Sequence, residues 1–197
     1  MNVTLLGSHP AVDFLNTAFE PDGVPVEAIG SGKAYLDWLA EAGLLDRAVA
    51  TRLSRQFGAE AMDEAAAEAR AFREWVRTWL ARWRAAPGGN YRAEVARLNK
   101  VLDRATLRRQ VVAGREMQAV EAPRIDTPED LVGLVAVQVA ALVTEEEPKL
   151  LKSCTGTGCT LWFLDRTKAH GRLFCSAAAC GNRAKVAAFR ERQRTRG

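Results

Sequence analysis

All four cysteines of this 197-residue chain lie in one short window, and their spacing constrains the fold more than any other feature. Cys154 and Cys159 are separated by TGTG, Cys175 and Cys180 are separated by SAAA, and fifteen residues lie between the two pairs. Zinc prefers four tetrahedral ligands, and two short cysteine pairs can supply them from two corners of a small fold. The window therefore predicts a Zn²⁺ site with Cys154, Cys159, Cys175 and Cys180 as ligands.

A disulfide framework is the main alternative for these cysteines. The opening segment MNVTLLGSHP has neither the basic region nor the apolar stretch of a secretory signal, so we expect a cytoplasmic protein, where disulfides are rare. Cysteines placed only for core packing would not all gather in one window. Zinc thus remains the favoured interpretation.

The ligand set also bears on catalysis. Four thiolates close the coordination sphere and leave no position for a reacting water, which predicts a structural metal. His170 and Asp165 lie between the cysteine pairs and could act as ligand or base. An exposed loop histidine and a carboxylate paired with a neighbouring arginine are the simpler roles. We expect that the chain is not an enzyme.

Charge divides the chain into two parts. Residues 149–197 contain eleven Lys and Arg residues and two acidic residues, whereas residues 1–148 contain seventeen basic and twenty-two acidic residues. A concentrated positive patch attracts polyanions, because phosphates that are neutralised release their condensed counterions. The alternative is a solvated tail whose charges maintain solubility.

Apolar spacing predicts a mainly α (α+β) body over residues 1–148, with a boundary at the acidic run 145–147 and Pro148. Residues 107–122 are typical of two short strands around a turn at 113–114. The longest apolar stretch, 131–143, has 13 residues and is too short to span a bilayer, so we expect no membrane partner. Helices are expected over 11–19, 33–42 with Ser31 as N-cap, 46–57, 59–86, 91–104 and 127–144.

The residues from the first cysteine pair onward resemble the CGNR zinc finger. The match rests on Cys180-Gly181-Asn182-Arg183 and on the stretch TLWFLDRTKAHGRLF that precedes Cys175. The segment HPAVDFLNT at 9–17 resembles the opening motif of the ABATE domain, which precedes that finger in bacterial stress-induced transcription regulators. The resemblance implies a helical, ligand-binding-like domain over 1–148 and a treble-clef finger over 149–197.

A treble clef consists of a knuckle, a short hairpin and a helix that carries the second ligand pair. We expect the knuckle at 154–159, strands at 161–164 and 172–174, and a helix over 177–194, with Val186 and Phe189 facing a small core. Basic residues recur on this helix at helical spacing, which is how several finger classes present side chains to DNA. The predicted DNA-contacting residues are Asn182, Arg183, Lys185, Arg190, Arg192 and Arg194.

For two of these residues, a structural role is as well supported by the sequence as a DNA contact. Asn182 could bond the backbone of the knuckle, and Arg183 could pack on Phe163 or Phe174. For Arg190, Arg192 and Arg194 we favour phosphate contact over a solvated face.

Four polar residues of the body lie among apolar neighbours and match recurring polar positions of the resembling family. Buried polar groups must be paired, so they either bond one another or line a pocket for a small-molecule effector. A hydrogen-bond network or simple helix caps are the alternative to a pocket. The tryptophans of the 59–86 helix are interpreted as core or as a partner-binding face. The candidate effector-binding residues are Asp13, Asn16, Arg73 and Asn99.

These observations together predict a zinc-binding bacterial transcription regulator with a helical effector-sensing body and a basic finger that contacts DNA. A zinc-stabilised adaptor for protein or RNA is the alternative. A small metallohydrolase would need an open metal site, which the cysteine set does not offer. One finger gives a short footprint, so a sequence-specific regulator is expected to bind as a homodimer.

Overall fold

The computed structural model describes residues 5–20 and 23–194 and divides the chain into two compact units. One unit comprises Met1–Ala28 together with Glu145–Gly197, and we refer to it as the finger unit. The other comprises Ile29–Thr144 and is the helical unit. One border between the units, Thr144/Glu145, lies close to the domain boundary expected between 148 and 149, and the first 28 residues group with the C-terminal region; the two domains 1–148 and 149–197 stay a prediction.

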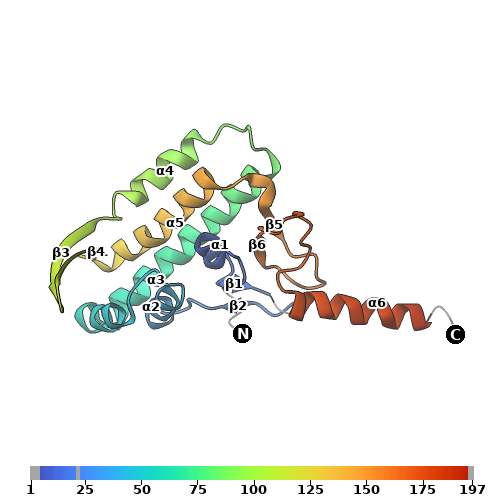
Figure 1. The fold of residues 1–197 in the computed structure, drawn as a ribbon, viewed down its shortest axis with the longest axis horizontal. Coiled ribbons are helices and arrows are strands. Elements are labelled where there is room, and N and C mark those ends of the chain that lie inside the picture. Colours follow the sequence, from blue (N-terminus) through green and yellow to red (C-terminus); the bar gives the residue numbers. More distant parts are fainter. Residues whose placement is uncertain (1–4, 21–22, 195–197) are drawn as a thin grey trace. The chain divides into compact units, whose positions relative to one another are not determined.

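The helical unit is built from helices whose ends follow local signals in the sequence (Figure 1). The Ser31 hydroxyl accepts the N–H of Ala34 at 3.2 Å at the start of one helix, and Thr127 forms a capping box with Asp130 before another. The helix breaks at Gly58, whose φ of 80° is non-helical, so the two helices expected around this residue form one kinked element. The helices are α2 (Gly32–Glu41), α3 (Arg47–Ala85), α4 (Arg92–Leu102) and α5 (Leu131–Glu145).

The aromatic stripe of α3 belongs to the core of this unit. Trp79 and Trp83 are buried, whereas Trp75 is partly exposed and lies under the Arg97 guanidinium, 4.6 Å from the ring centre. Helix α2 packs along α3 and contributes Tyr35 and Leu39 to the same core. No helix in the described part of the chain is long and apolar enough to cross a membrane.

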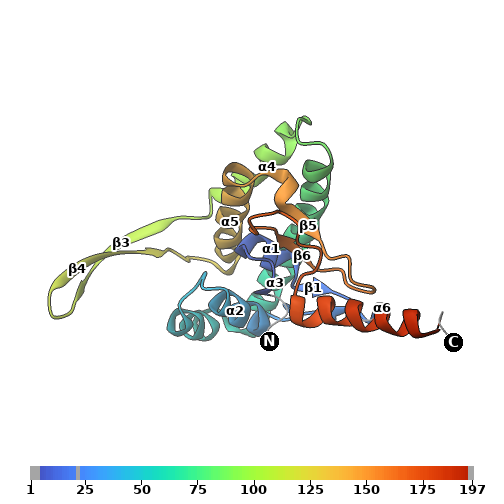
Figure 2. The ribbon, with the colours of Figure 1, turned by 45° about the vertical axis from the view of Figure 1, so that its right-hand side comes forward.

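The two strands expected in this unit form one regular antiparallel hairpin. Strand β3 (Leu107–Ala113) pairs with β4 (Met117–Pro123) from Leu107↔Pro123 to Ala113↔Met117. Figure 2 shows the hairpin extending away from the helices of its unit. The strands span nearly the same residues as the expected 107–122.

The finger unit contains three short elements from each end of the chain. The N-terminal part has α1 (Pro10–Leu15), β1 (Ala18–Phe19) and β2 (Val26–Glu27), and the C-terminal part has β5 (Leu151–Ser153), β6 (Trp162–Leu164) and α6 (Asn182–Arg194). The helix expected over 11–19 therefore ends at Leu15, and the residues that follow enter the β1–β2 pair. A single π-helical turn, Ala177–Gly181, precedes α6.

The hairpin of the finger differs from the sequence prediction. Strand β6 pairs antiparallel with β5 in the register Leu151↔Leu164, whereas residues 172–174 form no strand. The expectation of a strand at 172–174 was wrong because these residues bond the knuckle instead. The carbonyl of Leu173 accepts both the N–H and the hydroxyl of Thr155, each at 3.0 Å.

The N-terminal segment is attached to the other edge of β6. The Asn16 side chain donates to the carbonyl of Trp162 at 2.9 Å and accepts the N–H of the same residue at 2.8 Å. The carbonyl of Gly7 accepts the N–H of Leu164 at 2.7 Å, and the N–H of Glu20 donates to Thr160 Oγ1 at 2.9 Å. The segment thus covers an edge that a two-stranded sheet would leave open.

The Asn16 contact yields a stability prediction. Replacing Asn16 with Ala removes the two hydrogen bonds that it makes with the buried backbone of Trp162, which costs about 1–3 kcal/mol for each bond. We expect hydrogen exchange of α1 and β6 to show an opening free energy lower by roughly 2–5 kcal/mol. The matched control is Asn99→Ala on exposed α4, which should change stability by less than about 0.5 kcal/mol. Equal effects of the two substitutions would contradict a structural role for Asn16.

Candidate metal centre and basic helix

The four cysteines converge in the finger unit. Their sulfur atoms all lie within 4.8 Å of one another, with 3.8 Å between Cys159 and Cys175 and 3.5 Å between Cys175 and Cys180. Tetrahedral zinc with Zn–S bonds of about 2.3 Å requires sulfurs about 3.8 Å apart, so the cluster fits this ion. His170 is exposed and is not part of the cluster.

The knuckle depends on two glycines between the first cysteine pair. A side chain at Gly156 would lie 3.0 Å from Cβ of Cys180 and 3.2 Å from its sulfur, so a larger residue would push into the ligand cluster. Gly158 has a φ of 67°, the left-handed conformation that favours glycine. The TGTG spacer is thus suited to bring Cys159 back toward Cys154.

Hydrogen bonds to sulfur prepare the thiols for a metal. Backbone N–H groups of Gly156 and Cys175 donate to the Cys154 sulfur at 3.4 and 3.3 Å, and the Arg183 guanidinium donates to the Cys180 sulfur at 3.2 Å. Burial raises the pKa of Cys159 to about 11. Burial acts in the same direction on Cys180, but the bonds from Arg183 and Cys175 outweigh it and lower its pKa. Donors aimed at sulfur favour the thiolate, which is the form that binds zinc.

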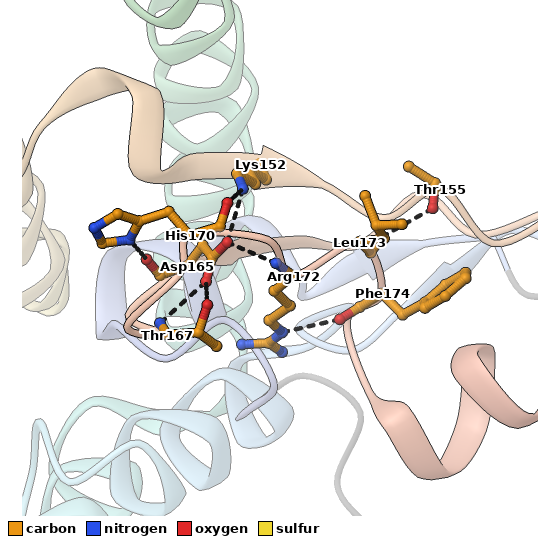
Figure 3. A network of polar contacts seen from close by, with 8 residues as sticks. All are labelled: Lys152, Thr155, Asp165, Thr167, His170, Arg172, Leu173 and Phe174. Carbon is orange, nitrogen blue, oxygen red and sulfur yellow. Dashed lines mark hydrogen bonds and ion pairs between the residues drawn. The ribbon is translucent and has the colours of Figure 1, made fainter.

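A buried carboxylate, Asp165, organises the loop between the two cysteine pairs (Figure 3). Asp165 is fully buried and accepts Lys152 Nζ at 2.7 Å, the Arg172 N–H at 2.9 Å, and both the N–H and the hydroxyl of Thr167. Burial alone would raise the pKa of Asp165, but these donors hold it well below its usual value. Both carboxylate oxygens of Asp165 thus accept hydrogen bonds, which gives this residue a structural role in the loop.

Arg172 extends this network into the N-terminal segment. Its guanidinium lies 4.2 Å from the centre of the Phe163 ring and donates to the carbonyls of Phe174 and Cys175. It also donates to Ser8 Oγ at 3.1 Å and to the carbonyl of Leu6 at 3.3 Å. Arg172 therefore has the aromatic-packing role that the sequence suggested for Arg183. The sequence signal for this role was the position of Arg172, which lies close to Phe174 and between the two cysteine pairs.

The four candidate effector-binding residues are divided between the two units. In the finger unit, Asp13 accepts the N–H of Gly7 at 2.7 Å, and burial raises its pKa to about 6. Asn16 bonds Trp162 as described above. In the helical unit, buried Arg73 pairs with Glu74 at 2.8 Å, whereas Asn99 is exposed. Asp13 and Asn16 thus have backbone partners of their own, and the effector pocket stays a prediction.

The basic helix α6 is exposed along its whole described length. It has no buried residue, and Val186 and Phe189 are 41% and 56% exposed. The expectation that these two residues face a small core was therefore wrong. The side of α6 that faces the knuckle carries Ala184 and Ala187, which line a hollow of about 340 Å³ together with Phe174.

Of the predicted DNA-contacting residues, Arg183 has a defined contact within the finger unit. The Arg183 guanidinium bonds the Cys180 sulfur and makes further interactions. These contacts favour a role in bracing the finger, which the sequence left open beside DNA contact. Asn182, Lys185, Arg190, Arg192 and Arg194 are all exposed, and the structure leaves their DNA contacts as predictions.

The geometry defines a zinc-finger protein whose metal site is closed by four cysteines and continues directly into a basic helix. Comparison with protein families agrees. A model described as "CGNR zinc finger" matches residues 151–193. A second, described as "Putative stress-induced transcription regulator", matches residues 8–146. The chain belongs to this ABATE-domain family of regulators, which is not described as an enzyme family. A search of the curated proteins finds no match.

We expect loss of one ligand to affect the N-terminal segment as well as the finger. Cys180→Ser should abolish binding of a single zinc ion, because a core of this size depends on its metal. Native mass spectrometry reports the metal, and hydrogen exchange should show lost protection in residues 6–17 and 151–181. Peptides from residues 59–85 of the helical unit serve as the internal control. Unchanged protection of α1 would contradict the finger unit as described.

Arg183 should tune zinc affinity. Removal of a residue that bonds a metal ligand typically lowers affinity by about 10–100-fold, and we expect this range for Arg183→Ala in chelator competition. Lys185→Ala is the control, because it removes the same charge from an exposed position of α6. Equal zinc affinity in both variants would exclude a bracing role for Arg183.

Proposed function

We propose that this chain is a DNA-binding transcription regulator in which α6 contacts the phosphate backbone. The observation that carries the proposal is the exposure of α6, which has five basic residues and one acidic residue and buries none of them. Side chains held away from the protein core on a rigid helix are available to a polyanion.

The basic residues of the finger unit that lie outside α6 strengthen the proposal, because several of them are paired within the protein. Lys152 pairs with Asp165, Arg166 pairs with Glu146, and Lys149 pairs with Glu147, whereas the Arg172 guanidinium donates to backbone carbonyls. Three of the basic residues before α6 thus have acidic partners. Helix α6 itself has five basic residues against one acidic residue, all on exposed side chains.

The remaining parts of the proposal follow from DNA binding. A chromosomal target places the protein in the bacterial cytoplasm. One helix covers a short footprint, so binding as a homodimer to two half-sites is included in the proposal. An adaptor that binds RNA or protein through the same basic helix is the competing function.

Salt dependence tests the phosphate contacts. Each contact contributes roughly one unit to the slope of log affinity against log salt concentration. Replacing Arg190, Arg192 and Arg194 with Ala should weaken binding to every duplex and flatten the slope by up to about three units. Fluorescence anisotropy on unrelated duplexes across a salt series measures both quantities.

The matched control removes three exposed arginines from α3. Replacing Arg47, Arg52 and Arg55 with Ala changes the net charge equally but leaves α6 intact. Its salt slope should stay as in the wild type. Wild-type affinity and slope in the α6 variant would reject the regulator in favour of the adaptor, as would stronger binding to RNA than to DNA.

A further inference from the structure

The exposed apolar residues of α6 lie in a strip that the phosphate contacts do not explain. Asn182, Val186, Phe189 and Gln193 follow one another at i, i+4, i+7 and i+11, so they share one face of the helix. This face lies on the side of α6 opposite to Ala184 and Ala187, which face the knuckle. Val186, Phe189 and Gln193 therefore lie on the side of α6 away from the knuckle, whereas Asn182 also lines a hollow beside Cys159 and Ala179.

Basic residues border the strip on both sides. Arg190 and Arg194 form one row at helical spacing, and Lys185 and Arg192 form a row on the other side. A helix with its side chains is about 10–12 Å across and fits the major groove of B-DNA, which is about 12 Å wide. In that position the two rows meet the two phosphate backbones, and the strip meets the base edges.

We propose that this strip reads A·T base pairs in the major groove. The proposal rests on the DNA binding proposed above. Asn and Gln side chains can bond adenine N6 and N7, and apolar side chains can contact the C5 methyl group of thymine. Asn182 and Gln193 at the ends of the strip recognise adenine, and Val186 and Phe189 between them cover thymine methyl groups.

Charge makes DNA the best occupant of this face. A second α6 packed on the strip would bring arginine and lysine rows against each other, and the single glutamate of α6 cannot neutralise them. Helices that lie in a membrane surface present a broad apolar face, whereas this strip has two apolar side chains with an amide at each end. A groove walled by phosphates matches both the charged rows and the narrow strip.

The test uses the full zinc-loaded chain and three duplexes of equal length with alternating A·T, A·U or G·C pairs. Uracil lacks only the C5 methyl group, so phosphate charge and hydrogen-bonding edges stay the same. Burying one methyl group contributes roughly fourfold in affinity, and we expect the A·T duplex to bind about 4–15-fold more tightly than the A·U duplex. The G·C duplex should bind more weakly than both.

A double variant links the effect to the strip. In Val186→Ala/Phe189→Ala the A·T and A·U duplexes should bind equally, with zinc content and salt slope unchanged. Leu173→Ala is the control, because this side chain is 58% exposed but lies outside α6. It should keep the preference for thymine.

The outcomes separate the two proposals. Equal binding of all three duplexes by the wild type, with a steep salt slope, overturns base reading but leaves phosphate contact intact. Absence of binding to any duplex overturns the proposed function itself. The assignment of this strip to DNA is overturned by two results together. The wild type shows no preference for thymine, and the double variant loses binding to anionic vesicles or loses self-association.

Discussion

The two hydrogen bonds between Asn16 and the backbone of Trp162 hold together parts of the chain that are 146 residues apart. The amide of Asn16 presents a donor and an acceptor side by side, as the backbone of a paired strand does. Strand β6 therefore has partners on both edges, β5 on one and the N-terminal segment on the other. A finger core formed by Leu161, Phe163 and the cysteines is small, and this second edge adds to what the metal provides.

Hydrogen bonds within the protein account for the polar residues of the motif at 9–17, and no bound ligand is needed to explain them. His9 caps α1 by accepting the N–H of Ala11 at 3.1 Å, Asp13 accepts the N–H of Gly7, and Asn16 bonds Trp162. Each polar residue thus has a backbone partner within the finger unit. The family match over 8–146 begins inside this unit, so the border between the two matched families is not the border between the compact units.

Local chemistry was predictable from the sequence, and long-range pairing was not. Cysteine spacing predicted the metal cluster, and Ser31, Thr127 and Gly58 marked helix ends and a kink, since these signals act within a few residues. The partner of β6 was missed because the expected treble-clef hairpin paired 161–164 with 172–174, and nothing in the local sequence marked residues 151–153 as a strand. The exposure of Val186 and Phe189 was missed because helical spacing shows that residues share a face but not what that face contacts.

The metal site also explains how a helix without a buried face can be part of the fold. An isolated helix of 13 residues is marginal in water, because its first turn is costly to form. Here Cys180 lies in the turn that leads into α6, so its ligation fixes this turn before the helix begins. Four thiolates around one Zn²⁺ leave an excess of negative charge, which favours the positive end of the helix dipole. The helix is therefore positioned through its N-terminus, and its basic side chains are exposed.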